Sequence, residues 1–333
     1  MAEKLIEVNQ LQVSFFDDGK KLPIIRAFDI SLQKGEIVGV LGESGSGKTI
    51  SANAIIRLFD VDEGSIDGGQ VRLCGEEISK LKEKAFADIR GRRISYIFQN
   101  AASALHPYRR VGNQIALAMK AHKMKMSKDD ILDALREAGI SDPQTVFDMF
   151  PSQLSGGQNQ RVMIAQSIVC RPDLIIADEP TSAVDASIQQ KVLDLLRDIN
   201  QKHGTAIIFI THDFDVAQYL CGRLLIMYGG LCVEEGGTEE ILRRPLHPYT
   251  EALIRCVESL DRGEETLYSL EGVPPTPYSF TDACPFYGRC RHRREECLDG
   301  IPQMIRQNGR MVRCIAEVAA GRTGGSIKER LDG

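Results

Sequence analysis

The chain has 333 residues, of which 43% are hydrophobic and 26% are charged, and its formal net charge at pH 7 is -5. These values are those of a folded globular protein that is long enough for one large domain with an appendage, or for two domains. They exclude a largely disordered chain, and the small acidic excess argues against nucleic acid as a partner, because phosphate-backbone binders normally carry a basic surplus.

The N-terminal region alternates apolar and polar side chains and carries acids early. It lacks the basic start and continuous apolar stretch of a signal peptide, and no run of about 18 apolar residues occurs anywhere, so we expect neither export nor a transmembrane helix. Apolar stretches at 5–16, 24–33 and 36–42 are separated by DDGKK and QKG. This pattern predicts strands joined by turns.

The third stretch runs directly into GESGSGKT, which is followed by a helical pattern in SANAIIRLF. The octapeptide fits the phosphate-binding loop G-x-x-x-x-G-K-[ST], in which backbone N–H groups and a helix N-terminus hold phosphate oxygens. Glycine at Gly45 and Gly47 avoids a clash with phosphate, Lys48 can reach the β and γ phosphates, and Thr49 can ligate magnesium. A chance surface loop is the alternative, which the position between strand and helix disfavours. The predicted ATP-binding residues are Gly42, Glu43, Ser44, Gly45, Ser46, Gly47, Lys48 and Thr49.

A further strand, RRISYIFQ, ends near Gln99, and the pattern is helical from about 111 to 150. Ser127 and Asp130 predict a capping box at the start of one of these helices. LSGGQ, at 154–158, opens another helical segment that ends at Pro172. Its serine and glycine pair can form a second anion cradle, although an ordinary helix cap would have the same sequence.

Two nearly all-apolar strands follow, LIIAD and TAIIFIT. Strands that are apolar on both faces are typical of the centre of a parallel sheet covered by helices, which places the fold in the α/β class. Asp178 and Glu179 follow the first strand, where buried acids are costly unless a cation is near. We expect Asp178 to hold magnesium and Glu179 to orient the attacking water, the alternative being acids that cap a turn. His212 and Gln99 end neighbouring strands and could reach the γ-phosphate, the metal or the water.

GESGSGKT, Gln99, LSGGQNQRVMIA, LIIADEPTSAVD and FITHD, in this order, resemble the ATP-binding-cassette (ABC) ATPases of transporters over about residues 5–255. The resemblance implies a P-loop NTPase cassette with a mostly parallel sheet core, an N-terminal antiparallel β subdomain and a helical subdomain at about 101–170. It also implies a head-to-tail pair of cassettes that closes ATP between the P-loop of one and LSGGQ of the other. The implied contacts are Phe15 on adenine, Ser155, Gly156, Gly157 and Gln158 on the partner's γ-phosphate, Glu179 as general base, His212 as switch histidine, and Asp185 in the loop between the two sites. Asn159 stands where arginine is frequent in that family.

RPLHPYTEALI, GVPP and the spacing C-x5-C-x6-C-x16-C narrow the resemblance to the oligopeptide, dipeptide and nickel importer ATPases. We expect a cassette at 1–258 and a C-terminal extension at 259–333, where the texture becomes proline-rich and then cysteine-rich. Cys284, Cys290, Cys297 and Cys314 supply the four thiolates of an iron-sulfur or zinc site. The family resemblance favours a 4Fe-4S cluster over structural Zn²⁺, and incidental free thiols are the third alternative. We expect the other five cysteines, which are scattered singly, to be small buried hydrophobic residues.

One copy of each motif cannot complete an ATP pocket of this kind, so a second ABC ATPase chain is required. In this branch it is commonly a related but distinct chain, which favours a heterodimer. The resemblance also implies two transmembrane permease subunits, an extracytoplasmic solute-binding protein acting indirectly, and a location at the cytoplasmic face of a prokaryotic membrane. Two rival functions are a nucleic-acid ATPase of repair or translation, and a non-hydrolysing iron-sulfur sensor. Proteins of the first kind tend to carry long heptad insertions or tandem cassettes, and neither is visible in this sequence. The complete set with Glu179 and His212 argues against the second.

Overall fold

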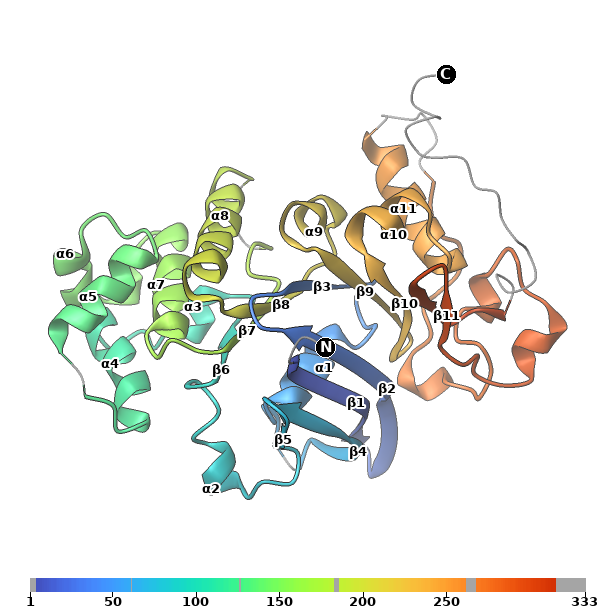
Figure 1. Cartoon of the computed structure of the whole chain (residues 1–333), viewed down its shortest axis with the longest axis horizontal. Coiled ribbons are helices and arrows are strands. Elements are labelled where there is room, and N and C mark those ends of the chain that lie inside the picture. Colours follow the sequence, from blue (N-terminus) through green and yellow to red (C-terminus); the bar gives the residue numbers. More distant parts are fainter. Residues whose placement is uncertain (1–3, 61, 126, 183–185, 262–267, 316–333) are drawn as a thin grey trace. The chain divides into compact units, whose positions relative to one another are not determined.

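The computed structural model describes residues 4–60, 62–125, 127–182, 186–261 and 268–315 (Figure 1). The chain divides into two compact units. Unit 1 comprises residues 1–7, 31–37 and 72–210, and unit 2 comprises residues 8–30, 38–71 and 211–333. Each unit is described by itself. Within the described ranges, no helix combines the length and apolar character that a bilayer crossing requires.

Unit 1 contains three parallel strands in the order β6-β7-β8, namely β6 (Ile94–Ile97), β7 (Leu174–Asp178) and β8 (Ala206–Ile210). Every residue of β7 and β8 is buried, which confirms that these apolar runs are interior strands of a parallel sheet. The register pairs Leu174 with both Ile94 and Ala206, and Asp178 with Ile210. The strands therefore end at a common edge, and the polar residues that follow β6 and β7 emerge there.

The helices of unit 1 follow the sequence expectation between 101 and 168. Those between the two strands β6 and β7 gather into one helical group, seen in green in Figure 1. Their bounds are α3 (Ala101–Ala104), α4 (Val111–Ala121), α5 (Lys128–Glu137), α6 (Pro143–Asp148), the 3-10 turn η1 (Pro151–Gln153) and α7 (Gly156–Ile168). The unit also holds β5 (Glu76–Glu77), α2 (Glu83–Phe86) and α8 (Ala186–His203). The capping box is confirmed, because Ser127 Oγ accepts from Asp130 N and Asp130 Oδ2 accepts from Ser127 N.

Unit 2 is built on strands in the order β4-β1-β2-β10-β9-β3. They are β1 (Lys4–Asp17), β2 (Lys20–Gln33), β3 (Ile37–Leu41), β4 (Gly64–Leu73), β9 (Arg223–Tyr228) and β10 (Leu231–Gly237). Asp18 and Gly19 join β1 to β2 with φ of 45° and 74°, a two-residue turn that suits a hairpin. β3 runs parallel to β9, and β9 runs antiparallel to β10, so this sheet is mixed. The helices are α1 (Lys48–Ile55), α9 (Phe214–Leu220), α10 (Thr238–Arg243) and α11 (Pro248–Asp261).

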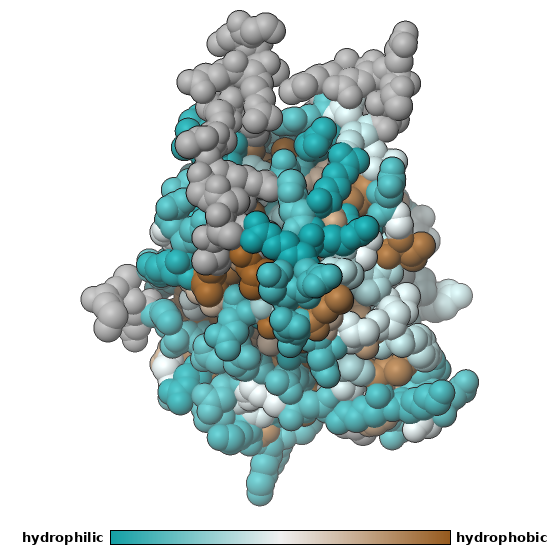
Figure 2. Space-filling model, turned by 90° about the vertical axis from the view of Figure 1, so that its right-hand side faces the viewer, coloured by the Kyte–Doolittle hydropathy of each residue, from teal (hydrophilic) through white to brown (hydrophobic). Residues whose placement is uncertain are grey.

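The C-terminal segment of unit 2 consists of short elements, which are η2 (Pro277–Ser279), η3 (Tyr287–Arg289), η4 (Glu295–Leu298), β11 (Ile305–Gln307) and β12 (Arg310–Val312). β12 pairs antiparallel with β10, so the segment continues the sheet of unit 2. Figure 2 shows the face of the molecule on the side of this segment in Figure 1, and that face is mostly hydrophilic with small, separate apolar patches. The largest apolar side chain of the cysteine-rich part, Phe286, is 2% exposed. The segment therefore buries the Phe286 ring, whereas Tyr278 and Leu298 are exposed.

A buried carboxylate ties the C-terminal hairpin to the segment that contains HPYT. Glu234 is fully buried and accepts hydrogen bonds from the backbone N–H groups of Leu246 and His247, each at 2.9 Å, and from Arg310 Nη1 at 3.3 Å. Burial lowers the pKa of His247 to about 3, so its ring is neutral and Nδ1 can accept the N–H of Tyr249 at 3.0 Å. These bonds fix the backbone of 246–249, which positions the Tyr249 side chain.

One expectation about the scattered cysteines is wrong. Cys170, Cys221 and Cys232 are buried, as predicted, and Cys256 is half-buried. Cys74 is exposed, because it lies in a turn with a φ of 50°, and its sulfur accepts a hydrogen bond from Arg93 Nη2 at 3.1 Å. The exposure of a side chain in a turn depends on what packs beside it in the folded chain, and the residues around Cys74 in the sequence do not indicate that.

Candidate functional site

The predicted phosphate-binding loop lies between β3 and α1 in unit 2, as its sequence indicated. Gly47 caps α1 with a φ of 104°, and a Cβ at Gly42 would lie 2.2 Å from the carbonyl oxygen of Met227. Only glycine fits these two positions, because one needs a left-handed backbone and the other touches a neighbouring strand end. The loop backbone is thus held close to β9 and leaves Ser44 and Gly45 exposed.

The loop lysine and one loop serine are both buried. Lys48 is 6% exposed, and its Nζ donates to the carbonyl oxygens of Gly42 at 2.7 Å and Glu43 at 3.0 Å. Ser46 Oγ is buried and has no hydrogen-bond partner within the described ranges. A buried hydroxyl without a hydrogen-bond partner, such as that of Ser46, is costly. The Lys48 ammonium group, which donates to carbonyl oxygens of its own loop, can donate to phosphate oxygens instead. The loop therefore fits a polyphosphate ligand.

Glu43 is fixed by residues from the C-terminal third of the chain, which the sequence did not indicate. Its backbone N–H donates to the hydroxyl oxygen of Tyr249 at 2.8 Å. Its carboxylate accepts from Arg289 Nη1 at 2.7 Å and from Nη2 at 3.1 Å, a bidentate ion pair in which Arg289 is 6% exposed. No spacing rule connects residues so far apart. The HPYT motif was the only signal, and it pointed to a family rather than to a contact.

In unit 1, β7 delivers the two predicted acids to its C-terminal end. Asp178 is 5% exposed, and its Oδ2 accepts the hydroxyl proton of Tyr96 at 2.9 Å. Burial and the adjacent Asp178 carboxylate raise the pKa of Tyr96, so the phenol stays protonated and donates. Tyr96 lies on the neighbouring strand β6 and was not predicted. Its alternation with Ser95 and Ile97 indicates only a strand, not a partner for the acid.

Glu179 and Gln99, both predicted as site residues, lie within hydrogen-bond distance of each other. Gln99 Nε2 donates to Glu179 Oε2 at 3.1 Å. Glu179 has a φ of 43°, a conformation that non-glycine residues adopt rarely, and its N–H donates to the carbonyl oxygen of Ile210 at 3.0 Å. Backbone strain of this kind costs on the order of 1–3 kcal/mol and persists only when neighbours impose it. The backbone hydrogen bond to Ile210, at the end of β8, holds this conformation here.

LSGGQ forms the start of α7, where Ser155 is the N-cap. Ser155 Oγ accepts from Gln158 N at 3.2 Å, and Gln158 Oε1 accepts from Ser155 N at 3.0 Å. Ser155, Gly156 and Gln158 are exposed, and a Cβ at Gly156 would meet nothing within 4 Å. Ser155 therefore acts as an ordinary helix cap, and the N-terminus of α7 is exposed on the surface. Asn159 points inward, and its Nδ2 donates to Pro151 O at 3.1 Å.

The remaining predicted residues fall in different parts of the chain. Phe15 is half-buried in unit 2, with its ring centroid 5.8 Å from that of Phe59. His212 is exposed and follows β8 by two residues. Asp185 lies outside the described residues. Unit 2 contains Phe15, the P-loop, His212 and the four clustered cysteines. Unit 1 contains Gln99, residues 155–158, Asp178 and Glu179.

The four C-terminal cysteines line one pocket, together with His247 and Phe286. The space that a water molecule can occupy in this pocket is about 10 Å³. None of the four forms a disulfide bond. Burial, together with the nearby thiols of Cys297, Cys314 and Cys290, raises the pKa of Cys284 to about 11. Within the described part of the chain, no group of three or more His, Cys, Asp or Glu side chains is arranged to hold a metal ion. The structure thus gathers the thiols around one space without closing them on a single point.

Two family descriptions match the chain. The family described as ABC transporter matches residues 25–182, and the one described as oligopeptide/dipeptide transporter, C-terminal region, matches residues 233–297. The first region contains the P-loop, LSGGQ and the acids after β7. The second contains HPYT and three of the four cysteines, Cys284, Cys290 and Cys297.

Curated relatives match the chain along nearly its whole length. It is 40% identical over 315 residues to the dipeptide transport ATP-binding protein DppD of Haemophilus influenzae, covering 93% of this chain and 94% of the relative. It is 36% identical over 314 residues to the oligopeptide transport ATP-binding protein AppD of Bacillus subtilis, covering 93% and 96%. Among solved structures, the post-hydrolysis dimer of the ATP-binding cassette MJ0796 with ADP and Pi is similar, at a TM-score of 0.62 and 26% identity, over 70% of this chain and 98% of that one. The chain therefore belongs to the ATP-binding subunits of ABC transporters, in the oligopeptide/dipeptide importer branch.

Proposed function

We propose that this chain hydrolyses ATP to power the import of peptides through membrane permease subunits, and that the residues assembled above carry out that hydrolysis. Hydrolysis of ATP to drive transport is the activity of its family. The relatives named for dipeptide and oligopeptide transport support a peptide as the cargo. The single observation that supports the catalytic part is the Gln99–Glu179 hydrogen bond at the end of a buried strand, because a carboxylate and an amide held together can orient the same water molecule.

In this proposal the phosphates of ATP lie in the cradle from Gly42 to Thr49, and Phe15 stacks on the adenine. Lys48 exchanges the carbonyl oxygens of Gly42 and Glu43 for phosphate oxygens, so it needs no large movement to bind. Thr49, Gln99 and Asp178 would hold Mg²⁺, which offsets the negative charge that develops on the transferring phosphoryl group. The buried Asp178, oriented by Tyr96, fits a nearby Mg²⁺. The buried Ser46 hydroxyl, which has no hydrogen-bond partner within the described ranges, fits a nearby phosphate oxygen.

Glu179 is assigned the general base of the reaction. Its carboxylate accepts the proton of the water that attacks the γ-phosphate, and Gln99 keeps the carboxylate oriented through the 3.1 Å hydrogen bond. The strained backbone of Glu179 supports this role, since strain is retained where a side chain must point in one direction. His212 is assigned to the γ-phosphate, and Asp185 to communication between two sites.

The working unit is proposed to be a pair of cassettes. The exposed start of α7, with Ser155, Gly156, Gly157 and Gln158, supplies N–H groups and a hydroxyl that face outward and can complete a site in another chain. The similar cassette MJ0796 was solved as a dimer. We propose that the second cassette is a related but distinct chain, and that two permease subunits bind the pair at the cytoplasmic face of the membrane. An extracytoplasmic binding protein would deliver the solute to the permease subunits from the other side of the membrane.

The four-cysteine pocket is proposed to hold a 4Fe-4S cluster, with Zn²⁺ as the alternative. The thiols fit the group in number and kind, because four cysteines that line one pocket are the ligand set of such a cluster. A cluster would supply covalent cross-links to a segment built of short elements. We propose Cys284, Cys290, Cys297 and Cys314 as its ligands, in a C-terminal extension at 259–333 that follows the cassette at 1–258 with its helical part at about 101–170.

The experiment that tests the catalytic proposal is Glu179→Gln. Turnover of ATP by the assembled transporter should fall by about a hundredfold or more, as for other general bases, while the affinity for ATP is retained. Glu240→Gln, an exposed acid on α10, is the matched control and should leave turnover unchanged. Undiminished hydrolysis by the Glu179 variant would remove this residue from its role. Uptake of labelled di- and oligopeptides by cells with and without the gene tests the cargo.

A further inference from the structure

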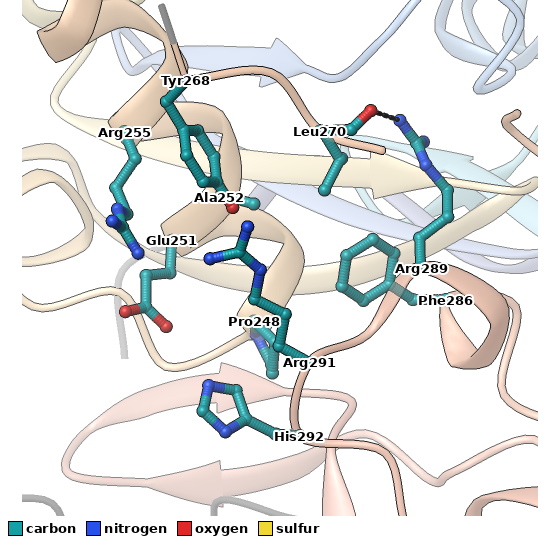
Figure 3. Close-up of a pocket in the computed structure, with 10 residues that line it drawn as sticks. All are labelled: Pro248, Glu251, Ala252, Arg255, Tyr268, Leu270, Phe286, Arg289, Arg291 and His292. Carbon is teal, nitrogen blue, oxygen red and sulfur yellow. Dashed lines mark hydrogen bonds between the residues drawn. The ribbon is translucent and has the colours of Figure 1, made fainter. Parts of the chain in front are cut away.

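Arg289, in the cysteine-rich segment, is connected to the phosphate-binding loop by a saturated set of hydrogen bonds. A guanidinium has five N–H groups, and each of them has an acceptor here. Nη1 donates to Glu43 Oε2 at 2.7 Å and to Tyr228 Oη at 3.2 Å, Nη2 donates to Glu43 Oε1 at 3.1 Å and to Leu270 O at 3.3 Å, and Nε donates to Glu271 O at 3.1 Å. The bond to Leu270 is drawn in Figure 3. Lysine, with three donors and no planar fork, cannot reproduce this arrangement.

The surroundings of this guanidinium hold it in one place. Tyr228, at the end of β9, lies with its ring centroid 4.4 Å from that of Tyr249 and 5.3 Å from that of Phe286. Tyr249 in turn accepts the backbone N–H of Glu43 at 2.8 Å. Figure 3 shows Phe286 and Arg289 side by side on the wall of a pocket that Pro248 and Ala252 of α11 also line. The loop residue Glu43 is therefore held through its carboxylate and through its backbone by the same cluster.

The charge of Glu43 gives this ion pair a function. Glu43 is the one acid in the loop, and its backbone carbonyl is a partner of Lys48. A carboxylate within the phosphate cradle repels the polyphosphate that binds there, and the repulsion is strong where water is excluded. The Arg289 guanidinium, whose side chain is 6% exposed, neutralises this charge and fixes the carboxylate through two hydrogen bonds.

Arg289 is also the residue before Cys290. It ends η3, where its backbone N–H donates to Phe286 O at 3.0 Å and the N–H of Cys290 donates to Tyr287 O at 3.3 Å. The segment closes on itself through Cys284 N, which donates to Cys297 O at 2.9 Å. The position of Arg289 therefore depends on how the cysteine segment is folded.

We propose that Arg289 is a positioning residue of the ATP site, which acts through Glu43 and makes the affinity for ATP depend on the folded state of the cysteine segment. The inference rests on the proposed use of the P-loop for ATP. By linkage the effect is reciprocal, so ATP must stabilise the cysteine segment by the same factor. The segment thus has a role in the cassette beyond a structural appendage.

The first test is a double-mutant cycle on the full-length chain, with the Kd for ATP measured by equilibrium dialysis in the Glu179→Gln background. Arg289→Gln should weaken ATP binding by about tenfold, the change that about 1.4 kcal/mol produces, because Glu43 is left without a counter-charge. Glu43→Gln alone completes the cycle, and adding Glu43→Gln to Arg289→Gln should recover most of the tenfold loss, since no acid remains to be neutralised. Arg289→Lys should give an intermediate affinity because it keeps the charge without the fork.

The matched control is Arg291→Gln, at an exposed arginine of the same segment whose guanidinium lies over the Tyr268 ring; this variant should bind ATP like the parent. Equal losses in Arg289→Gln and in the double variant would show that the effect comes from damage to the segment and would overturn the role of Glu43. Parent-like binding by Arg289→Gln would overturn the inference entirely.

The second test measures hydrogen exchange of the amides in 284–297 with and without ATP. ATP should slow exchange in the Glu179→Gln protein, and this protection should disappear in the Glu43→Gln variant, which leaves the C-terminal segment unaltered and is usable even if Arg289→Gln does not fold. Protection that is absent in the parent, or that survives in Glu43→Gln, would contradict the coupling. Failure of the proposed catalytic role is distinguishable, because it appears as retained turnover in Glu179→Gln and leaves ATP affinities and exchange rates as they are.

Discussion

Tyr96 donates its hydroxyl proton to Asp178, at 2.9 Å, from the strand that runs parallel to the one carrying the acid. The register pairs Tyr96 with Ile176, two positions before Asp178, so the phenol reaches along the strand to the carboxylate. The bond fixes one oxygen of an acid that is 5% exposed. Orientation of a metal-ligand carboxylate by a neighbouring donor commonly accounts for a tenfold or larger part of metal affinity.

Tyr96→Phe is the prediction that follows from this bond. Removal of the hydroxyl should raise the Mg²⁺ concentration for half-maximal ATP hydrolysis by about tenfold, because Asp178 loses the donor that orients it, while the ring still packs against Phe98. The measurement is ATPase rate against Mg²⁺ concentration at fixed ATP. Tyr108→Phe, at a tyrosine that is 85% exposed, removes the same atom and should change nothing. An unaltered Mg²⁺ dependence in Tyr96→Phe would separate this tyrosine from the metal.

The exposed start of α7 predicts a defect that is visible only in the dimer. Ser155→Arg places a bulky cation on the surface that is proposed to meet a second cassette, and the core is untouched because Ser155 is exposed. In the Glu179→Gln background, light scattering after gel filtration should show loss of the ATP-dependent dimer, with the Kd of the monomer for ATP within about twofold of the parent. Ser152→Arg, three positions earlier and also exposed, is the control. A full dimer yield with Ser155→Arg would contradict a role of this residue in the shared site.

Glu137 predicts a pH-dependent contribution to stability in unit 1. This carboxylate, 9% exposed, ends α5 and accepts from Arg171 at 2.8 Å and from Lys202 at 3.2 Å, and it also contacts His203 at the end of α8. Burial acts to raise the pKa of Glu137, but the bonds from His203 and Lys202 outweigh it, so the pKa lies below its ordinary value. A lowered carboxyl pKa stabilises the fold above the unfolded value of about 4.3 and loses that stabilisation as the pH falls through the folded value.

Glu137→Gln should therefore lower the free energy of unfolding at pH 7 by about 1–2 kcal/mol. The difference between variant and parent should shrink as the pH is lowered below about 4.3, where the parent carboxylate is also protonated. Urea unfolding at a series of pH values measures both. Glu83→Gln, at an acid that is 67% exposed and paired with Arg90, should cost less than about 0.5 kcal/mol. A pH-independent difference would show that packing and not charge carries the effect of Glu137.

The cysteine pocket predicts that the protein binds a metal centre through its four thiols and through no other cysteine. Protein purified anaerobically should contain iron and acid-labile sulfide and should absorb broadly in the visible range, whereas zinc would be colourless. Cys290→Ser should abolish most of the bound metal, measured by elemental analysis. Cys256→Ala, a half-buried thiol outside the pocket, should retain it. Metal retained in Cys290→Ser, or no metal in the parent, would contradict the assignment.

The features that the sequence predicted correctly are those decided by a few consecutive residues. The strand–loop–helix at Gly42 to Thr49, the capping box of Ser127 and Asp130, and the buried strands β7 and β8 depend on backbone hydrogen bonds, caps and apolar periodicity, all of which act over short chain distances. Cys74 shows the limit of such patterns, because exposure at a turn depends on what packs beside it.

The sequence by itself therefore determined the cassette motifs and the residues that can carry the chemistry. Only the tertiary structure decided which side chains hold them: Tyr96 on Asp178, Tyr249 on the backbone of Glu43, and Arg289 on its carboxylate across 246 positions of the chain. Such pairs form where strand register and the docking of the C-terminal segment bring distant residues within hydrogen-bond distance. No spacing in the sequence predicts these contacts, because they depend on the packing of the whole unit.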